Sequence, residues 1–497
     1  MTTTGESRRD LARGGALSFI GSATSAAMGL VLIIVLGRTL GDAGSGVVLQ
    51  AIGAFTIALG VARFGMDSVA IWLLPRQLED DRASIRPTGW FLLGTSAVAG
   101  IVCSLVLLAG TAVVEAQSPG DPVAEALRAI LWYLPVASVL LTALSATRAL
   151  GKVTAYVLVG NVALPTLRPL AIMVAVGLGA GATGAAVAWA LPLAPAVLAA
   201  VLVLVLQLRR LGAPRTHGFL RSGVPAKAIT YALPRVLSSG LEQLLIWLSV
   251  IVVGAITGPA AAGVYGSASR FVAAGMIVDT ALRVVVSPMF SRLQHRGASA
   301  ELEEVYRTAT VWLVLFSTPV YLLLAAFAPV ALSLLGESFA DGEPVLIIMC
   351  AGAIITFLAG NIHSILLMSG RSGLAALNKA IAVAVNIGLL YVLVPVWGIT
   401  GAAVAWAVAC ALDAGLATLE VRFLLRIRVS PFPGLYPLLV GLLGVGIPAW
   451  ACRLLLGPTW LGLIVAAVVG AALFLVWCRL DRRRLQLSGL ARASHRD

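Results

Sequence analysis

Residues 181–190 read GATGAAVAWA and residues 398–407 read GITGAAVAWA, so nine of ten positions are identical at an offset of 217. The same offset places Asn161 on Asn378. A match at separated places under one offset indicates an internal repeat, which determines the architecture. The small residues of these stretches suit close helix packing. A direct part in substrate binding is the alternative.

The offset also places LGRTLGDAGSGV (36–47) on VGAITGPAAAGV (253–264). We therefore predict two halves, residues 1–215 and 216–430, followed by an unrepeated segment at 431–497.

The composition is that of a membrane protein. Of the 497 residues 60% are hydrophobic and 11% charged, and the mean hydropathy is +0.99; soluble proteins carry about 25% charged residues. The apolar runs exceed 20 residues and lack the alternation of barrel strands, which indicates membrane-spanning helices. The net charge of +13 is explained by membrane topology, and we expect no nucleic-acid partner.

We predict an all-α polytopic membrane protein with about 14 transmembrane helices, six in each half and two at the C-terminal end. The predicted spans are 15–37, 45–74, 88–114, 127–147, 153–178, 183–208, 227–257, 261–290, 307–335, 344–369, 374–396, 399–421, 434–456 and 459–478.

Lysine and arginine alternate between the loops as the positive-inside rule requires. With the N-terminus inside, 26 of the 35 basic residues fall in cytoplasmic segments and 3 in outer ones. We expect a multi-pass protein of a bacterial cytoplasmic membrane with both termini in the cytoplasm. Six spans per half keep the orientation of the second half, so this is a parallel repeat of two six-helix bundles around a cleft.

Ten ionisable residues lie within the predicted spans. At about 2.5–3.5 kcal/mol each, the set would cost on the order of 30 kcal/mol facing lipid, so these side chains must face the cleft, pair with each other, or reach the interface. They are Arg63, Asp67, Arg168, Arg235, Glu242, Arg270, Asp279, Arg283, Lys379 and Asp413.

Two of these sets have helical pair spacing. Arg63 and Asp67 are four residues apart, and so are Asp279 and Arg283. The repeat offset brings the pairs within one residue of each other with their order reversed, so we expect them on opposite sides of the cleft. They either hold helices in place or line the transport path and change partners.

Basic residues without an acid one turn away suit an anionic cargo, because arginine binds phosphate with a planar fork. Arg168, Arg270 and Lys379 are of this kind, and Lys379 is also near enough to the interface to reach it. Arg235 and Glu242, seven residues apart, share a helix face without direct contact.

Two further polar residues have two interpretations each. Asp413 is either a proton or cation site or the partner of an arginine in the cleft. His363 is either a satisfied polar residue at a helix contact or a proton relay.

Nothing in the sequence predicts catalysis. The chain contains no phosphate-binding loop, no metal-ligand cluster and no GxSxG, so we expect a transporter without cofactors. Its five cysteines lie in apolar spans and are interpreted as buried thiols.

Three stretches resemble the lipid-linked oligosaccharide and polysaccharide flippases of the multidrug/oligosaccharidyl-lipid/polysaccharide exporter superfamily. They are LARGGALSFIGSATSAAMGLVLIIVLGRTLGDAGSGVV (11–48), VVGAITGPAAAGVYGSASRF (252–271) and the two GAAVAWA turns. The resemblance covers about residues 15–425. It implies a V-shaped pair of six-helix bundles that exports a polyprenyl-diphosphate-linked sugar. It implies a cationic cavity at Arg63, Arg270 and Arg283, and a lipid-tail groove at 434–478.

We therefore expect a flippase that moves a polyprenyl-diphosphate-linked oligosaccharide by alternating access. Arg63, Arg270, Arg283, Arg168 and Arg235 would bind the cargo. Four acids would pair, gate or couple: Asp67, Asp279, Glu242 and Asp413. Membrane lipid and polysaccharide-assembly proteins are the expected partners. A MATE-like drug/cation antiporter would favour an acid-dominated cavity, and a membrane glycan polymerase or ligase would need a large outer loop.

Overall fold

The computed structural model describes residues 3–151, 153–211, 219, 222–369, 371–430 and 432–487, and every regular element within them is a helix. The chain forms two compact units, residues 1–263 and 264–497, which are treated separately below. The all-helical fold expected from the composition is confirmed.

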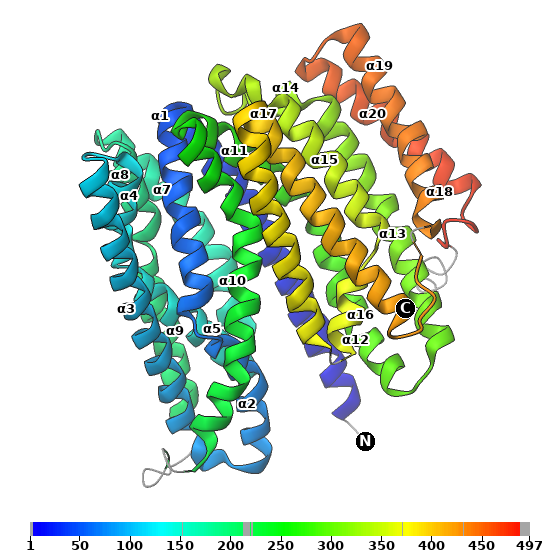
Figure 1. Ribbon diagram of the computed structural model, residues 1–497. Coiled ribbons are helices and arrows are strands. Elements are labelled where there is room, and N and C mark those ends of the chain that lie inside the picture. The colour runs from blue at the N-terminus through cyan, green and yellow to red at the C-terminus, as the bar shows by residue number, and fades with distance from the viewer. Residues whose placement is uncertain are drawn as a thin grey trace. The chain divides into compact units, whose positions relative to one another are not determined.

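The helices of the first unit follow the predicted spans closely (Figure 1). They are α1 (Thr3–Ala62), α2 (Met66–Asp80), η1 (Arg82–Ser84), α3 (Ile85–Gln117), α4 (Pro122–Leu131), α5 (Leu134–Ala149), α6 (Val153–Ala155), η2 (Tyr156–Ala163), α7 (Leu164–Gly177), α8 (Ala182–Ala190), α9 (Leu193–Arg209), α10 (Val224–Thr257) and the start of α11 (Pro259–Gly275).

The second unit begins within α11. Its other elements are α12 (Ile277–His295), α13 (Ser299–Ala326), α14 (Ala328–Ser333), η4 (Glu337–Gly342), α15 (Glu343–Leu358), α16 (Ile362–Met368), α17 (Ser372–Phe423), α18 (Phe432–Gly441), η5 (Leu442–Gly446), α19 (Ile447–Leu456) and α20 (Trp460–Leu480).

In the described chain, ten helices are long and apolar enough to cross a membrane, or twelve if two bent pairs each count as one span. This number does not confirm the expected fourteen. Two of the ten are far longer than the roughly 20 residues that one crossing needs, namely Leu17–Asp80 with 64 residues and Gly373–Phe423 with 51. If each crosses twice, the count reaches fourteen, which stays a prediction.

A glycine interrupts each of these long helices. Gly41 has φ 68° and Gly398 has φ 56°, in the region that side-chain-bearing residues avoid. In Figure 1 the chain turns back near the α1 label and again near the α17 label. The expected boundaries between spans at 37–45 and 396–399 contain these two glycines.

Several predicted spans are broken where the sequence analysis expected continuous helices. The span 45–74 is interrupted at residues 63–65, where Phe64 and Gly65 have positive φ. Helices α11 and α12 are bent by 42° at Met276, and α4 and α5 by 52°. These breaks matter because charged residues lie beside two of them.

In the first unit, glycines bring α1 close to α10 and α11. A Cβ on Gly46 would lie 1.7 Å from the carbonyl oxygen of Pro259, and one on Gly263 would lie 2.0 Å from that of Asp42. Gly46 and Gly263 are equivalent positions of the repeat. Such close backbone approach is how helices pack in lipid, where no hydrophobic force pulls them together.

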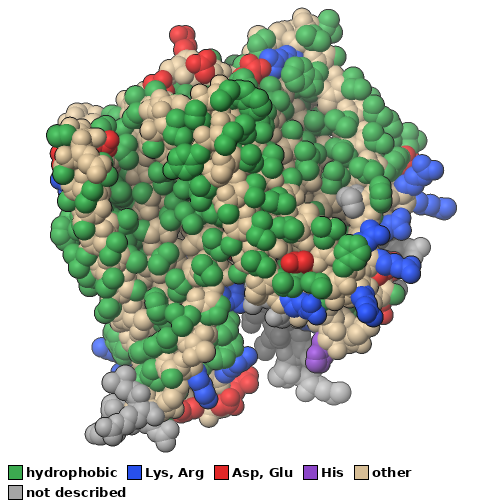
Figure 2. Space-filling model, viewed as in Figure 1, with side chains coloured by type: hydrophobic (Ala, Val, Ile, Leu, Met, Phe, Trp, Pro, Cys, Tyr) green, Lys and Arg blue, Asp and Glu red, His purple; other side chains and the backbone are tan. Residues whose placement is uncertain are grey.

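Hydrophobic side chains cover most of the face seen in Figure 2, and charged side chains lie mainly near helix ends. Large exposed hydrophobic residues include Val106 on α3, Leu198 on α9 and Val468 on α20. Water would penalise such a surface, whereas lipid does not.

Replacing Gly46 with Ala tests the helix contact. The new methyl group would overlap the Pro259 carbonyl, so we expect the free energy of unfolding to fall by about 1–3 kcal/mol. Gly110→Ala on α3 is the matched control, because a Cβ there meets no atom within 4 Å. Thermal unfolding of the purified protein in detergent measures both variants, and equal midpoints would contradict the assignment.

Candidate functional site

The first charged pair lies at the break between α1 and α2. Arg63 Nη1 is 2.9 Å from Asp67 Oδ2, and both side chains are about one-fifth exposed or less. Asp67 is in the first turn of α2, where the free N–H groups of the helix favour a negative charge. The backbone carbonyl of Arg63 accepts a hydrogen bond from Ser96 of α3 at 3.3 Å. The predicted pairing of Arg63 with Asp67 is therefore present.

This pair leaves polar atoms unused. Arg63 Nε and Asp67 Oδ1 are buried and have no hydrogen-bond partner among the described residues. A buried donor of this kind costs free energy unless a partner is supplied. The site can therefore form further hydrogen bonds to a polar ligand without first losing the ion pair.

Arg168 is held by the repeated decapeptide. Its guanidinium carbon lies 4.0 Å from the centre of the Trp189 ring, and Trp189 contacts Phe55 edge-to-face at 5.5 Å. Trp189 is 5% exposed, and its alanine neighbours in α8 are buried as well. The packing interpretation of the decapeptide fits this burial. The aromatic face stabilises a cation here without a carboxylate.

Arg235 belongs to an aromatic stack between α2 and α10. Its guanidinium carbon is 5.8 Å from the Tyr231 ring, Tyr231 stacks on Trp72 at 4.4 Å, and Arg76 lies 4.7 Å above Trp72. Glu242 is exposed and takes part in none of the ion pairs found among the described residues. Arg235 is thus half-buried by rings.

In the second unit, Arg283 Nη2 lies 2.5 Å from Asp279 Oδ2 in α12. The Asp279 side chain is 8% exposed and the Arg283 side chain 55%. As in the first unit, the acid sits in the first turn of a helix that follows a break. Arg270 is half-buried near the end of α11. The guanidinium of Arg283 is the most accessible of the paired ones and is the best placed to bind an anion.

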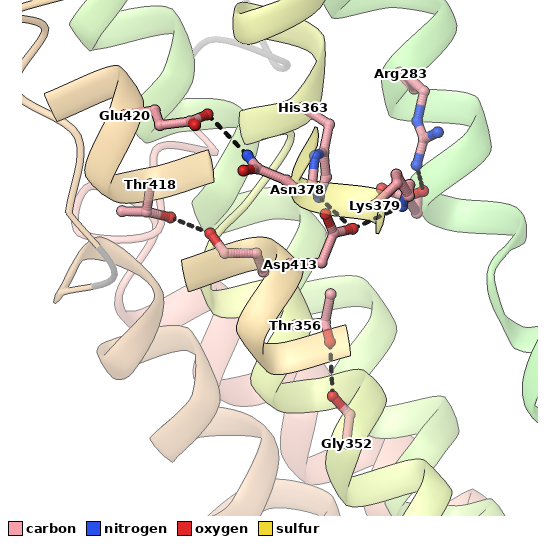
Figure 3. A network of polar contacts seen from close by, with 11 residues as sticks. Arg283, Gly352, Thr356, His363, Asn378, Lys379, Asp413, Thr418 and Glu420 are labelled. Atoms are coloured by element: carbon pink, nitrogen blue, oxygen red, sulfur yellow. Dashed lines mark hydrogen bonds and ion pairs between the residues drawn. The ribbon is translucent and has the colours of Figure 1, made fainter. Parts of the chain in front are cut away.

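A cluster around Asp413 forms the most buried charged group of the second unit (Figure 3). Lys379 Nζ donates a hydrogen bond to Asp413 Oδ2 at 2.6 Å, and His363 Nε2 lies 3.4 Å from the same oxygen. The Asp413 side chain is 4% exposed. Next to it, Asn378 donates to Glu420 at 2.8 Å. The partner of Asp413 is therefore a lysine, and not the arginine that was one of the two expectations.

This cluster has no counterpart in the first half of the repeat. At the offset of 217, Val162 corresponds to Lys379, Ala196 to Asp413 and Ala146 to His363. The shared fold therefore does not require these polar residues. Their presence in one half alone indicates a function that the other half lacks.

The sequence analysis missed how Lys379 and His363 are used. Asp413 and Lys379 are 34 residues apart, so helical spacing cannot pair them. The signal that could have found them is the repeat itself, which sets three polar residues against three apolar ones. It also missed Arg453, whose Nη2 lies 2.5 Å from Glu343 and whose Nη1 donates to the Ala326 carbonyl at 2.8 Å.

Arg453 fastens α19 to the rest of the second unit, so we expect Arg453→Gln to lower the free energy of unfolding by about 1–3 kcal/mol. Arg479→Gln at the exposed end of α20 is the control and should leave stability unchanged. Thermal unfolding in detergent compares the two, and an unchanged midpoint for Arg453→Gln would mean that this contact contributes nothing.

Solved structures with the same fold are membrane transporters. The lipid II flippase MurJ in an inward closed conformation matches with a TM-score of 0.67 at 14% identity, covering 94% of this chain and 98% of that one. An inward-facing multidrug resistance MATE transporter of the MOP superfamily matches at 0.62 and 17% identity, covering 82% and 94%. The protein thus has the fold of the MOP superfamily transporters.

The sequence defines the family more narrowly. Residues 11–294, more than half of the chain, match the family described as "Polysaccharide biosynthesis protein", and the chain belongs to this family. A stretch of 168 residues is 26% identical to the "Probable low-salt glycan biosynthesis flippase Agl15" of Haloferax volcanii, covering 34% of this chain and 36% of that protein. The match spans about a third of that relative's length. These relatives are transporters or flippases, not enzymes.

Proposed function

We propose that this protein is a flippase that translocates a polyprenyl-diphosphate-linked oligosaccharide across the cytoplasmic membrane of a bacterium. The observation that carries the proposal is the membership of a polysaccharide biosynthesis family in a chain with several intramembrane arginines. A diphosphate head group needs cationic partners, whereas its polyprenyl tail stays in lipid. Both termini would lie in the cytoplasm, where polysaccharide-assembly proteins could meet them.

In this proposal, five arginines bind the diphosphate. They are Arg63, Arg270, Arg283, Arg168 and Arg235. Arg283 supports this role best, because its side chain is more than half exposed and already bonded to a carboxylate. A phosphate can replace a carboxylate on the same guanidinium fork, since both accept parallel N–H bonds. Asp67 and Asp279 would then be the groups displaced, with Glu242 and Asp413 gating or coupling.

Alternating access would move the predicted bundles 1–215 and 216–430 against each other. The unrepeated segment 431–497 would serve the lipid tail. An apolar groove of about 380 Å³ supports this, because its lining includes Leu442, Ile447 and Trp450 of η5 and α19 together with Leu322 of α13. Isoprenoid chains bind by such apolar contact alone.

A drug/cation antiporter is the second candidate, because MATE transporters share the fold. Among the ten ionisable residues of the predicted spans, six basic residues outnumber four acids, which favours an anionic cargo. A MOP superfamily transporter from Pyrococcus furiosus, described as having a binding pocket of reversed polarity, matches with a TM-score of 0.60 at 15% identity, covering 84% of this chain and 95% of that one.

The cargo can be identified directly. We expect mass spectrometry of lipids that co-purify with the protein to find a polyprenyl-diphosphate glycan, and Arg283→Ala to reduce its amount. Finding phospholipid alone would contradict the flippase proposal and leave the antiporter.

A single substitution tests the anion site. Arg283→Ala should lower glycan export at least tenfold, if one charge-assisted hydrogen bond of about 1.5–3 kcal/mol is lost. Arg292→Ala, at the exposed end of the same helix, is the matched control and should export normally. Export is measured as surface glycan, normalised to the amount of folded protein. Normal export by Arg283→Ala at normal protein level would exclude Arg283 from the cargo site.

A further inference from the structure

The second unit contains a titratable cluster that cargo binding does not explain. Asp413, Lys379 and His363 come from α16 and from both halves of α17, which are separated by Gly398. Figure 3 shows the lysine and the imidazole converging on one carboxylate. Burial of such a group costs free energy, and the first half of the repeat has only apolar residues at these positions.

We propose that Asp413, Lys379 and His363 form a proton-exchange site that couples transport to protons, with the Lys379 ammonium occupying the place of a metal cation. The coupling role rests on the proposed transport function; the proton exchange does not.

The geometry excludes a sodium site in this arrangement. The nearest groups to Asp413 Oδ2 are two nitrogens, Lys379 Nζ at 2.6 Å and His363 Nε2 at 3.4 Å. Hard cations prefer several oxygen ligands. A positive charge already bonded to the carboxylate also repels a second cation. No group of three His, Cys, Asp or Glu that could hold a metal occurs among the residues searched.

The proton step needs no other reactant. A hydronium ion gives its proton to His363 Nε2 and leaves as water. The imidazolium passes that proton to the Asp413 carboxylate, and the imidazole returns to its neutral form. Asp413 Oδ1 is buried without a hydrogen-bond partner among the described residues, so an oxygen is available to carry the proton. The neutral acid then no longer holds the Lys379 ammonium.

The consequence is mechanical. Lys379 lies before Gly398 and Asp413 after it, so their ion pair joins the two halves of α17. Protonation removes one charge of the pair, which lets these halves move apart, and deprotonation restores it. This is a two-state element that a proton gradient can bias.

Other titratable or charged groups surround the cluster and set its response to pH. Those within electrostatic range, or bonded beside it, are Arg283 of α12, paired with Asp279, and Cys410 and Glu420 of α17. Arg283 and Lys379 both favour the ionised form of Asp413, whereas Asp279 and Glu420 oppose it.

Infrared difference spectroscopy of the full-length protein in lipid nanodiscs tests the exchange without any cargo. As the pH falls, we expect a carbonyl band of a protonated carboxylic acid to appear, and Asp413→Asn to remove it. Asp67→Asn, in the arginine-paired acid of the first unit, is the matched control and should keep the band. Absence of the band in the wild type, or its persistence in Asp413→Asn, would overturn the proposal.

Sodium is the competing ion. Equilibrium binding of radioactive sodium should find no site in the wild type, whereas Lys379→Met should create one. Sodium binding by the wild type that Asp413→Asn abolishes would show a cation site instead. If Asp413→Asn does not fold, His363→Gln decides: the band should remain, but appear roughly 10²-fold more slowly after a pH jump, the loss expected for a positioned proton-transfer group. An unchanged rate would refute the relay.

These outcomes are separable from those of the proposed function. If co-purified lipids contain no polyprenyl-diphosphate glycan while the band behaves as expected, the flippase proposal fails and the proton site stands.

Discussion

The cost of placing a charge in hydrocarbon governs this structure. Each intramembrane charge needs a partner within the protein, because lipid supplies none. The described residues use three solutions: pairs one helical turn apart, as in Arg63 and Asp67; an aromatic face, as Trp189 for Arg168; and a bond between helix segments, as Lys379 and Asp413. The first two stabilise locally. The third depends on how α17 folds back, and so it alone changes when the fold moves.

The sequence was informative where the physics is local. Apolar runs of helical length predict the spans, the glycines at 41 and 398 lie where the chain turns, and four-residue spacing predicts the pairs Arg63–Asp67 and Asp279–Arg283. It was uninformative where the physics is tertiary. The break at residues 63–65 is invisible in an apolar run, because packing against neighbouring helices compensates for the lost backbone bonds. The bond from Lys379 to Asp413 joins residues 34 apart, and only the fold brings them together.

The repeat shows which features belong to the fold and which to function. The decapeptide is buried in both copies, as the alanines at 185 and 402 illustrate, so packing is its common role. Its tryptophan has diverged in use. Trp189 stacks on Arg168, whereas Val385 stands at the position equivalent to Arg168, and Trp406 lies 3.5 Å from the Cβ position of Gly352. One motif thus supports a cation in the first half and only close helix packing in the second.

The same comparison explains why the two halves divide their tasks. The first half stabilises Arg168 and Arg235 with aromatic rings, which leave the guanidinium hydrogen atoms able to bond to an anion. The second half surrounds Asp413 with two nitrogen groups that respond to protons. An arginine keeps its charge at any physiological pH, whereas a carboxylate between lysine and histidine does not need to. Permanent charge suits holding an anionic head group, and variable charge suits switching. A transporter needs both, and a duplicated chain can place each in a different copy.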